Sequence, residues 1–218
     1  MKFDGVEVFW LGHDCFKLKF EDLVVYTDPF ELKEGEPADL ILVSHEHFDH
    51  CDLDSIRVIS KDGTEIVGSE GAVRKIGKGK ALEEGEEIEV KGVKIKAVPA
   101  YNVNKFRAPG QPFHPRGLGV GFVFELGGLK FYHAGDTDAV PEMSALAEEN
   151  VDVAMLPISG VYVMTEEEAL NAVGMIKPKK VIPMHYGSLE GVGGDPERFK
   201  ELVEQKFEGI EVVIPSKS

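Results

Sequence analysis

The feature that most restricts the fold of this chain is a run of apolar residues, 40–43, that stops abruptly before Ser-His-Glu-His-Phe-Asp-His. A continuous apolar run of this length predicts a β-strand that is covered on both faces. Strand ends in layered α/β proteins border the clefts where ligands bind. The residues that follow the run, His45 and His47 among them, are therefore expected at the edge of the core, facing a cleft.

The residue types after this strand are those that bind metal ions. His45 and His47 are two positions apart, so on an extended backbone their side chains point the same way and can share one ion. Asp49 and His50 lie past the bend and can turn toward a second ion, and imidazole with carboxylate suits zinc and its first-row neighbours. The alternative is a polar loop with chance histidines, but three of the 7 histidines of the chain fall within residues 45–50.

Two more candidate ligands follow apolar strands further along the chain. Asp136 lies in His-Ala-Gly-Asp-Thr, and His185 follows the run Val-Ile-Pro-Met. Each alone is a weak indication, because an aspartate at a strand end is commonly a helix cap or a turn former. Together they repeat the arrangement around His45, an apolar strand and then a ligand-type side chain. The sequence therefore predicts a metal site where several strand ends meet.

Alternating polar and apolar residues predict hairpins that turn at Glu21–Asp22, Lys91–Gly92 and Gly127–Gly128, and helices are expected at 70–79 and from Pro141, Thr165 and Asp195. A Pro- and Gly-rich loop is expected over 99–119. The segments that end in Asp28 and Asp136 resemble each other, and each precedes an acid-led apolar strand. This echo predicts an α/β fold of two similar halves, with two sheets face to face and helices outside. Coincidence among short β patterns is the alternative.

Composition restricts the function. The length of 218 residues suits one domain, 1–218, and a formal net charge of −15 opposes binding to a nucleic acid backbone. The 2 cysteines are too few for a disulfide framework and fit a reducing compartment. No apolar run approaches the ~18 residues of a membrane span, and the N-terminus lacks the apolar segment of a signal peptide. A cytoplasmic protein is expected, with homo-oligomer formation left open.

The motif His45-x-His47-x-Asp49-His50, followed by Gly-Asp-Thr and a strand-end histidine, resembles the metallo-β-lactamase superfamily. The phrases WLGHDCF and MLPISGVYVMTEEEAL resemble its branch of small metal-dependent hydrolases, relatives of the ascorbate-6-phosphate lactonases. The resemblance implies an αββα four-layer sandwich with two divalent metal ions between the sheets, zinc first, with manganese, iron or nickel as alternatives. It implies that His45 and His47 bind one ion, that Asp49, His50 and His185 bind the other, and that Asp136 bridges the two.

One ligand position departs from the family pattern. The family has a third histidine on the first metal, after a strand like VKIKAVPA, where this chain has Tyr101 and Asn102. We expect His114 to reach in from the loop instead, with Asn102 as the alternative, supplying a carbonyl oxygen or a contact to substrate. By the same resemblance, Asp28 is the counterpart of Asp136 in the first half and holds a ligand histidine in its tautomer.

The remaining candidates concern catalysis and substrate. His13 follows a strand and is expected to be catalytic with Asp49, which orients the nucleophile; a structural histidine is the alternative. His133, three residues before Asp136, is expected to support the site rather than bind metal. The loop 102–119 has no acid and carries Lys105, Arg107 and Arg116, which predicts a small anionic substrate unless the loop is simply solvated.

The expected reaction is hydrolysis of a lactone, ester or phosphodiester by a metal-activated hydroxide. Two other functions stay open. One is a metal- or ligand-binding protein that keeps the fold without turnover, and the other is an RNA- or DNA-processing nuclease relative.

Overall fold

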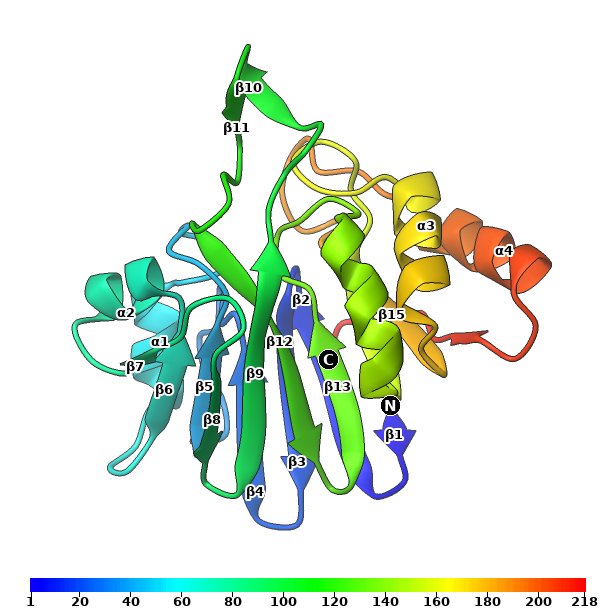
Figure 1. The fold of residues 1–218 in the computed structure, drawn as a ribbon. Helices are drawn as coiled ribbons and strands as arrows, with labels where there is room; N and C mark the ends of the chain where they lie inside the picture. The colour runs from blue at the N-terminus through cyan, green and yellow to red at the C-terminus, as the bar shows by residue number, and fades with distance from the viewer.

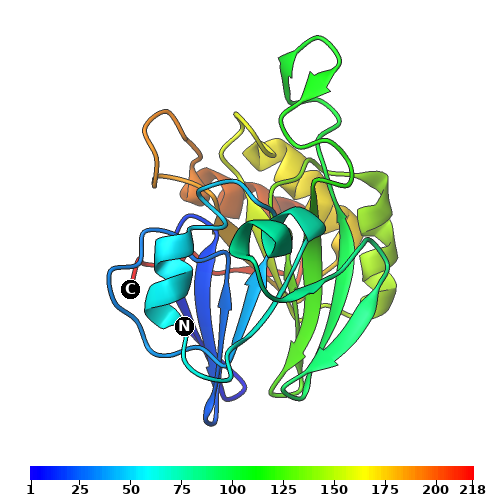
Figure 2. The ribbon, with the colours of Figure 1, turned by 90° about the vertical axis from the view of Figure 1, so that its left-hand side faces the viewer.

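In the computed structural model, which describes residues 1–218, two seven-stranded sheets pack face to face and the helices lie outside them (Figures 1 and 2). The layers are two helices, the first sheet, the second sheet and three further helices. This is the α/β sandwich of four layers that the sequence predicts. No helix has the length and apolar character needed to cross a membrane.

The first sheet contains the N-terminal third of the chain, with its strands side by side in sequence order. Its pairs are antiparallel as far as β4 and parallel beyond it. The strands are β1 (Lys2–Phe3), β2 (Val6–Gly12), β3 (Cys15–Phe20), β4 (Leu23–Thr27), β5 (Leu40–Val43), β6 (Glu65–Gly68) and β7 (Lys80–Ala81). The helices α1 (Leu53–Ile59) and α2 (Glu70–Ile76) cover its outer face.

The second sheet has the strand order β16-β15-β14-β13-β12-β9-β8. Its strands are β8 (Glu87–Val90), β9 (Val93–Ala100), β12 (Gly119–Leu126), β13 (Leu129–His133), β14 (Val153–Pro157), β15 (Lys180–Met184) and β16 (Glu211–Val212). The 3-10 helix η1 (Pro141–Glu149) and the α-helices α3 (Glu166–Ile176) and α4 (Pro196–Lys206) pack outside it. A small hairpin, β10 (Phe106–Ala108) and β11 (Gln111–Pro112), projects from one end of the sandwich (Figure 1).

Strand β5 illustrates how the core is divided. Leu40 and Leu42 belong to the large apolar cluster of 44 residues that fills the space between the sheets and beneath the second set of helices. Ile41 and Val43 belong to a separate cluster of ten residues beneath α1 and α2. All four side chains are fully buried, which confirms the prediction of a strand covered on both faces.

The sequence similarity between the two halves corresponds to a shared strand topology. Strands β2 to β7 make two antiparallel and then three parallel pairings, and β9, β12, β13, β14, β15 and β16 repeat that order. Asp28 follows β4, and Asp136 follows β13, the corresponding strand of the second sheet. The two aspartates therefore occupy matching places in the two halves.

Most expected elements are present, with three differences. The predicted hairpin turns and the helix starts at Pro141, Thr165 and Asp195 are observed. Helix α1 was not predicted, because its seven residues span only two turns, which is too short a stretch for apolar periodicity to identify a helix. The loop 99–119 contains the β10–β11 hairpin, and the closing strand that residues 210–214 predict is only two residues long.

Candidate metal centre

The candidate ligands gather at the end of the sandwich from which the β10–β11 hairpin projects (Figure 1). The segment 45–50 follows β5, Asp136 follows β13 and His185 follows β15. His13 lies in the turn between β2 and β3, and His114 lies just before β12. The centre is therefore built from strand ends of both sheets.

One group of donors consists of three histidines. The side-chain nitrogens of His45, His47 and His114 lie within 4.8 Å of one another. His45 Nε2 is 3.0 Å from His47 Nδ1, and the His114 ring lies 5.2 Å and 5.0 Å from those two rings, centroid to centroid. His45 and His114 are buried, and His47 is half-buried.

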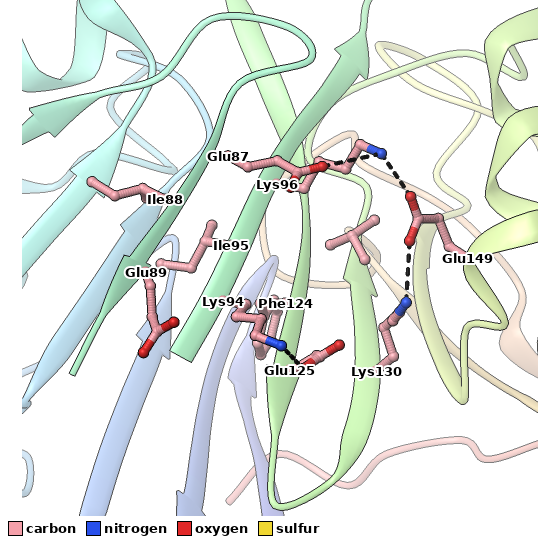
Figure 3. Close-up of a pocket in the computed structure, with 11 residues that line it drawn as sticks. Glu87, Ile88, Glu89, Lys94, Ile95, Lys96, Phe124, Glu125, Lys130 and Glu149 are labelled. Carbon is pink, nitrogen blue, oxygen red and sulfur yellow. Dashed lines mark hydrogen bonds and ion pairs between the residues drawn. The ribbon is translucent and has the colours of Figure 1, made fainter. Parts of the chain in front are cut away.

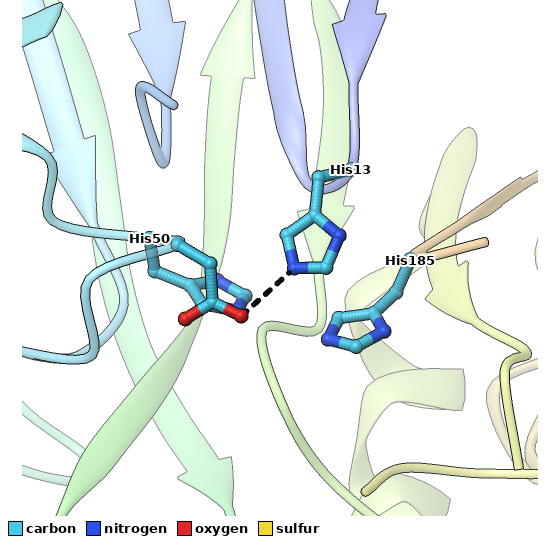
Figure 4. A group of neighbouring side chains, drawn as sticks. His13, His50 and His185 are labelled. Carbon is cyan, nitrogen blue, oxygen red and sulfur yellow. Dashed lines mark hydrogen bonds and ion pairs between the residues drawn. The ribbon is translucent and has the colours of Figure 1, made fainter. Parts of the chain in front are cut away.

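A second group combines His13, Asp49, His50 and His185, again within 4.8 Å. Figure 4 shows that the three histidine rings come from different segments and converge. His13 Nε2 is 3.2 Å from Asp49 Oδ2, and the His13 and His185 rings are 4.0 Å apart. His13 is fully buried.

Asp136 lies between the two groups. Its Oδ1 is 3.3 Å from His50 Nε2 and 3.2 Å from His185 Nε2, and its Oδ2 is 3.1 Å from His114 Nε2. One carboxylate oxygen of Asp136 therefore faces each group.

Most of the inward-facing histidines also contact a second side chain through their other ring nitrogen. A second atom fixes each ring by contacting the nitrogen that points away from the centre, which sets its tautomer and orientation. The contacts to Nδ1 are Asp28 Oδ2 to His50 at 2.8 Å, Asn102 Oδ1 to His114 at 2.9 Å, Ser44 Oγ to His45 at 3.0 Å, Ser159 Oγ to His185 at 2.9 Å and Ser188 Oγ to His13 at 2.7 Å.

Three residues of the site adopt left-handed backbone conformations. The φ angles are 53° at His13, 39° at Asp28 and 59° at His185. Side chains with a Cβ rarely adopt such angles, and residues held there cluster at functional sites. The backbone N–H of His185 donates to the carbonyl of His13 at 3.2 Å, so two of these residues support each other across the sheets.

Burial and opposite charges act on the donors in different ways. Burial lowers the pKa of His45 well below its ordinary value, so this imidazole stays neutral. Burial opposes protonation of His50 as well, but the Asp136 and Asp28 carboxylates raise its pKa well above the usual range. Asp136 is also buried, yet His185, His50 and His114 hold its pKa well below the ordinary value. Asp136 is therefore a carboxylate whose partners are imidazoles.

The donor atoms fit divalent metal ions. His50 Nε2, His185 Nε2 and Asp136 Oδ1 are buried and make no hydrogen bond. Buried polar atoms rarely lack a hydrogen-bond partner, so a cluster of such atoms facing one point needs a further partner. Imidazole nitrogens with carboxylate oxygens are the ligands of zinc, iron, manganese and nickel. The residues present are therefore suited to hold metal.

Sequence reasoning missed several supporting residues. Asp14 is fully buried, neither of its carboxylate oxygens has a hydrogen-bond partner, and its Oδ2 lies 3.7 Å from His50 Nδ1. Burial raises the pKa of Asp14 to about 7. The serines that hold His45, His185 and His13 were missed as well. The only signal was that Asp14 and Ser44 adjoin candidate histidines in the chain.

Other predicted residues lie elsewhere. His133 contacts the backbone carbonyl of Asp14 through Nε2 at 2.9 Å and so supports the turn that carries His13. Asn102 is buried, and its carboxamide oxygen also accepts from the backbone N–H of His114 at 2.8 Å. Asn102 therefore supports His114, and His114, not Asn102, joins His45 and His47.

The three basic residues of the loop are not brought to the centre. Lys105 pairs with Glu168 at 2.6 Å, and Arg116 pairs with Glu84 and Glu142 at 2.9 Å each. Arg107 donates to the carbonyl of Phe113 at 3.0 Å. None of the three is among the 11 residues that line the cavity beside the centre.

The fold and this donor set define the class. A model of the Beta-lactamase superfamily domain matches residues 7–185. The chain belongs to the metallo-β-lactamase superfamily, among proteins named UPF0173 metal-dependent hydrolases.

The relatives match over nearly their whole length. A UPF0173 metal-dependent hydrolase of Methanopyrus kandleri is 36% identical over 223 residues, which cover 96% of each chain. Its counterpart in Thermoplasma acidophilum is 37% identical, covering 97% of this chain and 96% of the relative. Among solved structures, a metal-dependent hydrolase of Parabacteroides distasonis has a TM-score of 0.85 at 34% identity, covering 96% of this chain and 92% of that one.

Proposed function

We propose that this protein is a binuclear metal-dependent hydrolase of a small substrate. The observation that carries the proposal is the position of Asp136, with one oxygen toward the His45, His47 and His114 group and the other toward His50 and His185. Two donor groups joined by a carboxylate suit a pair of metal ions, with zinc the first candidate and manganese, iron or nickel the alternatives.

The residues of the two donor groups would hold divalent ions, which would supply a hydroxide nucleophile near neutral pH and polarise the bond that is cut. The chain's own residues set the geometry around them. Although burial opposes it, the hydrogen bond from His13 helps to lower the pKa of Asp49 to about 2, so Asp49 is an acceptor only. Burial lowers the pKa of His13 to about 4, so His13 is a neutral ring that can donate from Nε2 to Asp49.

This contact changes the role that we assign to His13. The side chain is fully buried, is absent from the cavity lining and contacts Ser188 on its other nitrogen at 2.7 Å. We therefore propose that His13 positions Asp49 and that Asp49 orients the nucleophile. Asp28 plays the matching part behind His50.

The bond that is cut is a lactone, an ester or a phosphodiester. The negative charge predicted for the substrate depended on Lys105, Arg107 and Arg116, which are engaged outside the cavity. Hydrolysis by the metal centre does not require that charge, so the proposed reaction does not depend on it.

The test is metal analysis combined with a panel of lactone, ester and phosphodiester substrates. We expect about two metal ions per chain and turnover that His50→Ala abolishes. Tyr132→Phe is the control, since it changes a fully buried side chain outside both donor groups and should retain metal and turnover. One ion or none, without turnover, would instead support a binding protein. Cleavage of RNA or DNA alone would support the nuclease alternative.

A further inference from the structure

A cavity of about 490 Å³ opens directly onto the candidate metal centre. Its floor includes His47, His114, Asp136, His185 and Asp49. The other lining side chains are Phe48, Phe113, Tyr162, Leu189, Glu190 and Val192. Five of these six are apolar or aromatic, and a cavity of this size accommodates a small organic molecule. The part of a substrate that lies away from the metal therefore meets an apolar wall.

The aromatic side chains of this wall are fixed relative to the metal centre. The rings of Phe113 and Tyr162 pack edge to face with centroids 4.8 Å apart. The side-chain amide of Asn102 donates to the carbonyl of Tyr162 at 3.0 Å, and its oxygen holds His114. The wall and the metal centre thus share one anchoring side chain, which suits a site that binds one molecule in both places.

The lining of the cavity also includes an exposed phenylalanine. Phe48 is 66% exposed and lies between the ligand candidates His47 and Asp49 in the chain. Its ring contacts Phe30 edge to face with centroids 5.9 Å apart. Tyr162 and its neighbour Val161 are also more than a third exposed. Scattered apolar residues on a surface are ordinary, but several around one cavity mark a binding site.

Away from the metal centre, the wall of the cavity offers no positive charge to a substrate. No lysine or arginine lines it, and beyond the ligand candidates its only carboxyl group is that of Glu190. A phosphate or carboxylate placed along the wall would lose hydration without gaining a cation. A neutral apolar group would lose only unfavourable contact with water.

We propose that the cavity selects a neutral carboxylic ester or lactone that carries an aromatic or branched apolar group beside the scissile carbonyl. This inference depends on the proposed hydrolase function and replaces the predicted anionic substrate. In the reaction, water adds to the carbonyl and the acyl–oxygen bond breaks. The products are a carboxylic acid and an alcohol, which in a lactone are one molecule.

Binding can be measured apart from turnover, with hydroxamates that chelate the metal. On the metal-loaded protein, calorimetry should show that phenylacetohydroxamate binds about tenfold or more tightly than acetohydroxamate, because only the first buries a phenyl ring. A carboxylate on the para position should remove most of this gain. In the Phe113→Ala and Phe48→Ala variants the ratio between the two ligands should shrink. Phe106→Ala, which removes an exposed phenylalanine from the β10–β11 hairpin, is the matched control and should keep it.

The two proposals fail in different ways. Equal affinity for both hydroxamates, or tighter binding of the para-carboxylate, overturns the apolar cavity even if esters are hydrolysed. A persistent preference for the phenyl compound without hydrolysis of methyl phenylacetate, of a phenyl-substituted lactone or of any phosphodiester in the panel overturns the proposed function. Hydrolysis of methyl phenylacetate with higher kcat/KM than methyl acetate, lost in Phe113→Ala, supports both.

Discussion

The relation between Asn102 and His114 shows what a single residue contributes to this site. Both were candidates for the open position on the first metal, and the structure makes them partners. The backbone N–H of Asn102 donates to the carbonyl of His114 at 2.8 Å, and the Asn102 side chain bonds back to His114 twice. Twelve residues separate the two in the chain, and the β10–β11 hairpin closes that separation. Spacing alone could not predict a pairing that depends on such a closure.

Substitution of Asn102 should therefore weaken metal binding without removing a ligand. Asn102→Ala frees His114 Nδ1, and we expect the affinity for the ion at the His45, His47 and His114 group to fall by about 10- to 100-fold. Asn102→Asp keeps the acceptor oxygen and should retain most of the affinity. Competition with a chromophoric chelator measures both. Asn104→Ala, in the same loop but bonded to Glu168, is the control. Equal affinities for Asn102→Ala and Asn104→Ala would contradict the assignment.

The individual strands and hairpins were the most predictable level of the structure. Two-residue turns such as Lys91–Gly92 combine a glycine with alternating flanks, and both signals are local. Helix α3 was predictable for the same reason, because Thr165 and Glu168 form a capping box within four residues. Helix α1 was missed because what holds it is contact with the sheet, through Ile56 and Ile59.

Strands β8, β9, β12 and β13 carry a network of charged side chains that no sequence motif predicted. This ion-pair network lies on their outer face, where no helix covers the sheet (Figure 3). Lys96 lies between Glu87 at 3.4 Å and Glu149 at 2.6 Å, and Glu149 also contacts Lys130 at 3.1 Å. Glu149 belongs to η1, so the ion-pair network connects this helix to the sheet.

This ion-pair network predicts that the stability of the fold depends on pH. The hydrogen bond from Lys96 holds the pKa of Glu149 below its ordinary value of 4.5. A carboxyl group whose pKa is lower in the folded state stabilises the fold above the unfolded value, and this contribution is lost as the pH falls below it. Glu149→Gln should therefore lower the free energy of unfolding at pH 7 by up to about 1 kcal/mol, and the difference should be smaller at pH 3.

Urea denaturation at both pH values measures the effect. Glu89→Gln is the matched control, since Glu89 lies in the same groove (Figure 3) without an ion pair and should change stability little at either pH. A Glu149→Gln deficit of equal size at pH 3 would assign the effect to packing rather than charge.

At the scale of the whole molecule, the repeated strand order explains why the site could be predicted at all. Strand ends of both sheets meet at one edge, so ligand-type residues after apolar runs were expected to converge. The lining of the cavity was not predictable. Phe113, Tyr162 and Leu189 come from three separate loops, and nothing in their sequence spacing relates one to another.

Removal of metal should destabilise the whole fold. The centre buries His50 Nε2, His185 Nε2 and Asp136 Oδ1 without a hydrogen-bond partner, so ions bound there stabilise the folded state alone. At a free concentration about 100-fold above Kd, the gain is about 2.7 kcal/mol, or a Tm higher by roughly 5–10 °C. Differential scanning calorimetry before and after chelation measures the shift, and zinc added back should restore it. Identical melting with and without metal would exclude ions from the centre.

The hairpin turns at Glu21–Asp22, Lys91–Gly92 and Gly127–Gly128 lie at the end of the sandwich opposite to the centre (Figure 1). They are as short as hairpin turns can be, and a side chain on Gly127 would collide with Phe20 and Val6. The other end has the long loops. Inserted or exchanged residues at the tip of the β10–β11 hairpin or around Leu189 would leave every strand pairing intact. A lineage descended from this protein could therefore acquire new substrates by changing those loops while the rest of its sequence drifts only slowly.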